Sequence, residues 1–177
     1  KELASFTLSV QVYNFELPGI AHLKTYFYAQ PGKDYVSIDK RPRAEIVENF
    51  HQLLKDHRMN GNQALTPVFP KFKVENGKLT VTDWSGFDAD IEKRFKIYKQ
   101  INFPVPYLGM MGDNWGWFPQ NRDRKKPRRS PFGNFNWLSP EGLKYAGQYA
   151  KLFTAHVKEK FPGLNFYAYI YDEPPAR

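Results

Sequence analysis

Segments with the residue pattern of strands alternate with segments of helical spacing along most of this chain of 177 residues. Apolar residues recur at helical spacing over 43–57, 85–99 and 139–160, and each of these segments is followed by a short apolar run typical of a buried strand. Strands joined through helices run parallel, so this order predicts an α/β fold with helices packed on a parallel sheet. Four core strands are expected, at about 22–28, 64–69, 101–108 and 165–171.

Local signals predict where the elements begin and turn. Asn76-Gly77 between two β-favouring runs predicts a hairpin over 72–81. Ser85, with Asp88 three residues later, is predicted to cap the second helix, and Ser139-Pro140-Glu141 to start the third. The buried faces of the three helices are expected to consist of Ala44, Val47, Phe50, Leu53 and Leu54, then Phe87, Ile91, Phe95 and Tyr98, and finally Leu143, Ala146, Ala150, Phe153 and Val157.

Ahead of this alternation, residues 8–15 have the apolar-polar period of a strand, which Leu17-Pro18-Gly19 ends. We interpret this run as the last strand of a preceding domain. The composition, 41% hydrophobic and 25% charged, is that of a soluble globular domain, and no apolar run approaches the roughly 20 residues that cross a bilayer. No membrane association is therefore expected.

The residue types also narrow the chemistry. The chain has no cysteine and its four histidines are scattered, so neither a metal site nor a cofactor is expected. The net charge of +8 raises the possibility of a nucleic-acid partner, yet much of the excess lies in the single run 122–129. A solvated loop that aids solubility or attracts acidic substrates is the favoured interpretation of that run.

The last predicted strand ends at two adjacent carboxylates, Asp172 and Glu173, because the two prolines that follow cannot donate hydrogen bonds to a strand ladder. The carboxyl ends of strands are where barrels and open α/β enzymes carry their chemistry. Two neighbouring acids suit proton transfer, since burial raises one pKa while hydrogen bonds keep the other group ionised.

A second candidate segment follows the third predicted strand at the same edge, within the long loop 109–138. Its rings favour stacking on a flat ligand or, alternatively, packing of the loop onto the fold. The candidate substrate-binding residues are Trp115, Trp117 and Tyr171 by their rings, with Asp113 and Asn114 as hydrogen-bonding groups, and Phe132, Phe135 and Trp137 add further ring faces.

Five short motifs together resemble a known family in their order and spacing. They lie at 12–18, 22–25, 54–58, 84–88 and 169–174, and read VYNFELP, HLKT, LKDHR, WSGFD and YIYDEP. Over about residues 13–175 the chain resembles the catalytic barrel of glycoside hydrolase family 123 and its relatives, many of them uncharacterised bacterial proteins.

The resemblance implies a (β/α)8 TIM-type barrel preceded by a β-sandwich. Residues 1–18 would then be the end of the β-sandwich or a linker, and residues 19–177 the first half of the catalytic barrel. Because a complete barrel takes about 250 residues, only about the first four β/α units are expected in this chain. It would be a fragment of a larger enzyme or a half-barrel completed by a second chain. The resemblance also implies a secreted or periplasmic location.

The activity implied is removal of N-acetyl-β-galactosamine from glycans with retention of configuration. Asp172 would orient the acetamido group of the substrate, whose carbonyl oxygen attacks the anomeric carbon, and Glu173 would be the general acid and then the base. This substrate-assisted scheme needs no protein nucleophile. The alternatives are a non-catalytic carbohydrate-binding or scaffold module and, less favoured, a basic nucleic-acid binder.

Overall fold

The computed structural model describes residues 4–21, 23–25, 40–61, 67–108, 129–136 and 139–168. These residues form a mixed α/β structure, as the sequence predicts, with three two-stranded sheets and no closed barrel. None of the helices in the described part has the length and apolar character needed to span a membrane. The helices are α1 (Arg43–Asp56), α2 (Ser85–Tyr98) and α3 (Pro140–Lys160), and the strands are β1 (Lys71–Glu75), β2 (Lys78–Asp83), β3 (Asn102–Pro104), β4 (Arg129–Ser130), β5 (Gly133–Asn136) and β6 (Asn165–Tyr167).

The centre of the fold is the parallel pair β3 and β6, in which Asn102 lies opposite Asn165 and Pro104 opposite Tyr167. A parallel bridge between Gly61 and Asn102 adds the chain after α1 on the other side of β3. Both pairings of this part of the chain are parallel, which confirms within the described residues the predicted parallel direction of segments joined through a helix.

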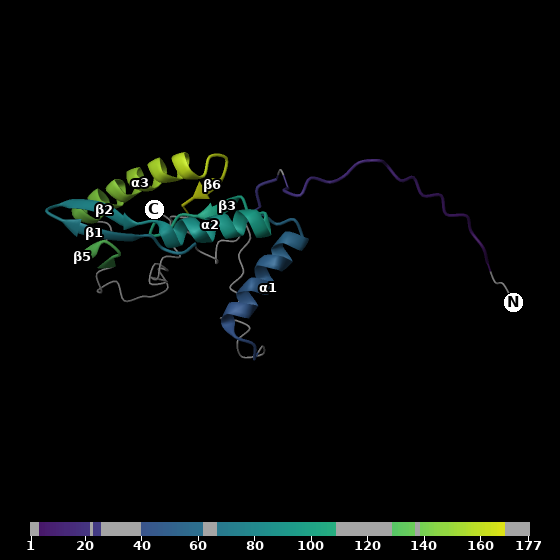
Figure 1. Ribbon diagram of the computed structural model, residues 1–177, viewed down its shortest axis with the longest axis horizontal. Coiled ribbons are helices and arrows are strands. Elements are labelled where there is room, and N and C mark those ends of the chain that lie inside the picture. The colour runs from purple at the N-terminus through teal and green to yellow at the C-terminus, as the bar shows by residue number, and fades with distance from the viewer. Residues whose placement is uncertain are drawn as a thin grey trace, which may run out of the picture.

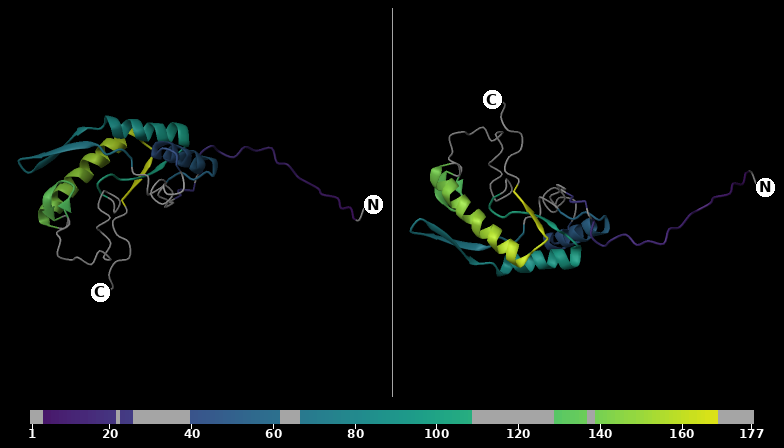
Figure 2. Two further views of the ribbon diagram at one scale, coloured as in Figure 1. Left: turned by 90° about the horizontal axis from the view of Figure 1, so that it is seen from below. Right: turned by 90° about the horizontal axis from the view of Figure 1, so that it is seen from above.

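Helices α2 and α3 cover one face of this pair (Figure 2). The ring of Phe166 in β6 lies 5.6 Å from that of Phe103 in β3 and 5.5 Å from that of Phe153 in α3. Phe87 in α2 joins the same buried cluster, at 5.5 Å from Phe153. Because side chains alternate along a strand, Asn102 and Asn165 face away from the helices.

An asparagine network lies on that second face. Asn60 accepts hydrogen bonds from the backbone N–H of Thr25 (2.8 Å) and from its hydroxyl (3.1 Å), and donates to the carbonyls of Ala21 (3.0 Å) and Leu23 (2.7 Å). The amide of Asn102 donates to the Thr25 carbonyl. The described part of the first predicted strand, residues 23–25, is thus attached to the sheet by these amides and not by a strand ladder.

The hairpin at Asn76-Gly77 is confirmed. Both turn residues have positive φ, 50° and 75°, as a two-residue turn between twisted strands requires. The N-terminal part of α3 lies along this hairpin (Figure 1), where Gln148 accepts from the N–H of Leu79 (2.7 Å) and donates to the carbonyl of Gly77 (3.2 Å). The long third helix therefore spans from the hairpin to the β3–β6 pair.

The two predicted helix starts have different outcomes. Ser139 caps α3 by accepting from the N–H of Gly142, as predicted. For α2 the predicted cap is wrong, because Ser85 is itself the first helical residue. The N-cap residue is Trp84, and Asp83 before it accepts from both the N–H (2.9 Å) and the hydroxyl (2.6 Å) of Ser85. These bonds, together with one from Lys71, lower the pKa of Asp83.

The buried faces of the helices are rotated from their predicted positions. In α3, Phe153 and Val157 are buried as predicted, but Leu143 is 54% exposed and the large rings of Tyr145 and Tyr149 take the inner face. The tyrosine rings occupy the inner face because their burial removes more apolar area from water than burial of the leucine would. In α2, Phe87, Ile91 and Tyr98 are buried and Phe95 is not; in α1, the buried residues are Ile46, His51 and Leu54, whereas Leu53 is exposed.

The predicted strand at 8–15 is wrong. Residues 4–19 extend away from the rest of the molecule (Figure 1), and their apolar side chains are exposed. A strand needs a partner for its backbone groups, and none of the described residues supplies one here. Of the other predicted strands, 101–108 is shortened to β3, 165–171 to β6 with residues 169–171 outside the described part, and 64–69 forms no strand over its described residues 67–69.

Candidate functional site

The carboxyl ends of β3 and β6 form one edge of the central sheet. Just past the paired strands, the N–H of Val105 donates to the carbonyl of Tyr167 at 2.9 Å. The chain therefore leaves both strands side by side and in the same direction. In parallel α/β folds this edge is where loops assemble a site.

All seven predicted site residues lie outside the described residues. The seven are Asp113, Asn114, Trp115, Trp117, Tyr171, Asp172 and Glu173.

An aromatic cluster lies beside this edge. Tyr107, three residues beyond β3, has a φ of 63°, and its hydroxyl donates to the Pro70 carbonyl at 3.0 Å. Its ring contacts those of Phe69 (4.6 Å), Phe72 (5.2 Å) and Tyr149 (5.4 Å) edge-on. Left-handed backbone at a non-glycine residue is costly, so these contacts must hold the conformation in place.

Phe132 belongs to this cluster as a core residue. It is only 3% exposed, and its ring lies 5.3 Å from that of Phe72 and 5.5 Å from that of Tyr149. Of the extra ring faces suggested for sugar stacking, Phe132 is thus excluded. The side chains of Phe135 and Trp137 lie outside the described part.

Tyr149 carries the most perturbed hydroxyl of this region. The side chain is fully buried, and its hydroxyl makes no hydrogen bond within the described part of the chain. Burial, and then the neighbouring Tyr107, raise the pKa of Tyr149 above its ordinary value of 10.0. Tyr149 is therefore a neutral packing residue and not a source of protons at this edge.

A histidine–aspartate pair, which sequence reasoning missed, joins α2 to α3. His156 lies 2.7 Å from a carboxylate oxygen of Asp88 and stacks on Trp84, with ring centroids 4.0 Å apart and planes 5° apart. Among the described residues, no serine or threonine hydroxyl is hydrogen-bonded to His156. His156 and Asp88 are 68 residues apart in the chain, so no local sequence pattern indicates that they form a pair.

The described residues contain no group of three or more histidine, aspartate or glutamate side chains that could hold a metal ion. In comparisons with known proteins, the chain matches no protein-family model, no curated protein and no solved structure.

Proposed function

We propose that this chain is the first half of a glycoside hydrolase barrel that removes N-acetyl-hexosamine, N-acetyl-β-galactosamine in particular, from glycans by a retaining, substrate-assisted mechanism. The proposal rests on the resemblance to glycoside hydrolase family 123 and extends to its setting: a secreted or periplasmic enzyme whose remaining strands come from further residues or a second chain.

The structural observation that supports the proposal is the parallel pairing of β3 and β6. Because of it, the two candidate segments, which follow these strands in the chain, begin at the same edge of the sheet. The tryptophans Trp115 and Trp117 follow β3, and the carboxylates Asp172 and Glu173 follow β6. Neighbouring parallel strands are about 4.8 Å apart, so a sugar at this edge lies within reach of both segments.

The roles proposed for the two acids are those that the resemblance implies. The carbonyl oxygen of an acetamido group becomes a better nucleophile when a carboxylate accepts a hydrogen bond from the acetamido N–H. The carboxylate also stabilises the positive charge that develops on ring closure. Asp172 has this role. Glu173 protonates the departing oxygen and afterwards takes a proton from water, which reopens the ring with net retention.

The test compares two nitrophenyl glycosides that differ at one position of the sugar. We expect the complete polypeptide containing this chain to hydrolyse nitrophenyl N-acetyl-β-galactosaminide. The β-galactoside with a hydroxyl in place of the acetamido group should react at least about a hundred-fold more slowly, because the internal nucleophile is lost.

Equal rates for the two glycosides would contradict the substrate-assisted mechanism, since a protein nucleophile would serve both. Binding of N-acetylgalactosamine by the folded protein without hydrolysis of either compound would instead identify a carbohydrate-binding module. Turnover is followed by release of nitrophenol and binding by calorimetry.

A further inference from the structure

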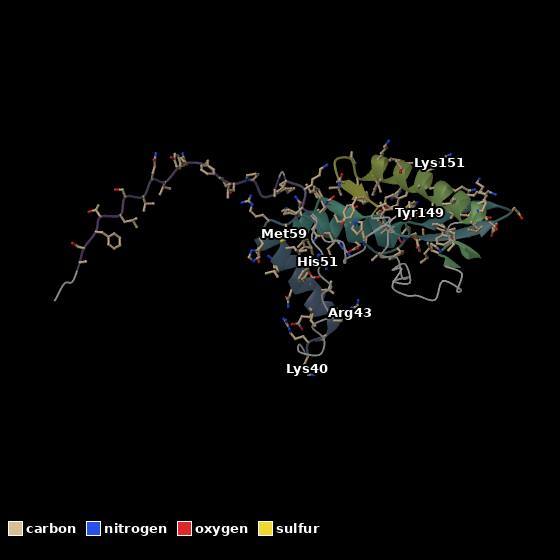
Figure 3. All side chains as sticks on the ribbon, turned by 180° about the vertical axis from the view of Figure 1, so that it is seen from behind. Lys40, Arg43, His51, Met59, Tyr149 and Lys151 are labelled. Carbon is tan, nitrogen blue, oxygen red and sulfur yellow. The ribbon has the colours of Figure 1, made fainter. Side chains whose placement is uncertain are left out.

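A buried histidine lies in the contact between α1 and α2. His51, midway along α1 (Figure 3), is 5% exposed, and its ring stacks on that of Tyr98 in α2 with centroids 5.1 Å apart. The side-chain amide of Gln100, just past the end of α2, donates to Nδ1 of His51 at 2.7 Å. The imidazole is thus enclosed by α2 and the turn that follows it, with Nδ1 as a hydrogen-bond acceptor.

The charged groups of α2 near this ring mainly disfavour protonation of the neutral imidazole of His51. Burial lowers the pKa of His51 from 6.5 to about 3, and the positive charges of Arg94 and Lys93 contribute further. Asp90 is engaged by Arg94, with 2.9 Å between guanidinium and carboxylate. The carboxylate of Asp90 is therefore already paired with another cation.

The charged groups on α1 itself do not favour protonation of His51 either. Glu48, one turn before His51, accepts from Lys93 at 2.8 Å and from the hydroxyl of Tyr98. Lys55, one turn after His51, adds another positive charge. A proton on His51 would thus enter a contact in which the neighbouring carboxylates are paired and the amide of Gln100 presents an N–H to the newly protonated nitrogen.

We propose that His51 is a pH-sensitive latch, so that acidification releases α1 from α2 while the rest of the fold stays in place. Helix α1 buries only Ile46, His51 and Leu54, so few other contacts oppose its release. The helix leads through Met59 to Asn60, whose hydrogen bonds connect Ala21 and residues 23–25 to the sheet. Release of α1 therefore also removes one support of that junction.

The direction of the effect follows from linkage. Protonation of His51 is disfavoured while α1 is docked, so its contribution to docking is complete above pH 6.5 and is lost as the pH falls toward 3. Within that window the ratio of released to docked α1 rises up to about tenfold per pH unit. Between pH 7 and pH 5 the expected rise is roughly twenty-five-fold.

Hydrogen exchange of the backbone amides tests the latch in the complete polypeptide. After correction for intrinsic exchange rates, protection of residues 43–56 should fall roughly twenty-five-fold from pH 7 to pH 5 and should stay well below the protection of α3 at both pH values, because α1 opens without global unfolding. His51→Gln keeps a hydrogen-bonding side chain without the titration and should abolish this fall. His57→Gln, at an exposed histidine, should behave as the unmodified protein.

Equal protection of α1 at both pH values, or protection of α1 as high as that of α3, would overturn the latch. A second measurement does not depend on any variant. In the unmodified protein the ring resonances of His51 should show no titration near pH 6.5 while α1 is protected, and a midpoint near 6.5 in the docked state would equally overturn the proposal.

Discussion

Glu173→Gln is expected to lower kcat/KM for an aryl N-acetyl-β-galactosaminide by about a hundred-fold to ten-thousand-fold, the usual contribution of a positioned general acid. The loss should depend on the leaving group. A methylphenyl glycoside, whose phenol needs a proton to depart, should show the full effect, whereas a dinitrophenyl glycoside, whose phenolate departs unaided, should show little effect on the first step. Steady-state rates for a series of aryl glycosides measure this dependence.

The matched control for that substitution is Glu159→Gln in α3, which removes the same charge from an exposed position. Its rates should equal those of the unmodified protein for every glycoside. A uniform loss in Glu173→Gln across the series would point to damaged binding or folding and would reject Glu173 as the acid.

Gly61→Ala is expected to destabilise the fold by about 2 kcal/mol or more. A Cβ at this position would lie 2.7 Å from the carbonyl oxygen of Asn102, 2.9 Å from its Cβ and 3.0 Å from the carbonyl oxygen of Thr25. Two of these three atoms are backbone, so the bridge from residue 61 to β3 has to move. Thermal unfolding followed by circular dichroism should show a drop of roughly 2–4 °C per kcal/mol.

Gly147→Ala in α3 is the matched control, because the same methyl group there meets nothing within 4 Å. Alanine favours the helix over glycine by roughly 0.5–1 kcal/mol, so the unfolding temperature should rise. If both variants unfolded at the temperature of the unmodified protein, residue 61 would not be part of a tightly packed sheet junction.

Local signals predicted the elements that depend on local interactions. The hairpin at Asn76-Gly77 and the start of α3 at Ser139 form as expected, because turn and cap geometry are set by neighbouring residues. The strand expected at 8–15 fails for the opposite reason: its alternation describes a side-chain pattern, whereas a strand also needs a partner. Pattern alone cannot supply that partner.

Contacts between residues far apart in the chain could not be predicted from the sequence. The amide of Asn60 and the buried ring of His51 depend on partners 35 to 49 residues away and have no periodic signature. The sequence does contain one sign of the asparagines on the second face of the sheet. Asn102 and Asn165 each precede a buried or half-buried phenylalanine at the start of a core strand. The roles of Asp172 and Glu173 remain predictions that rest on the resemblance and on the shared edge of β3 and β6.

In the proposed mechanism the substrate's own acetamido group attacks the anomeric carbon while the acids after β6 assist. Proton NMR of the sugar first released from nitrophenyl N-acetyl-β-galactosaminide, recorded before the anomers equilibrate, tests this most directly. The β-anomer should appear first, because two inversions restore the starting configuration. Initial release of the α-anomer would contradict it.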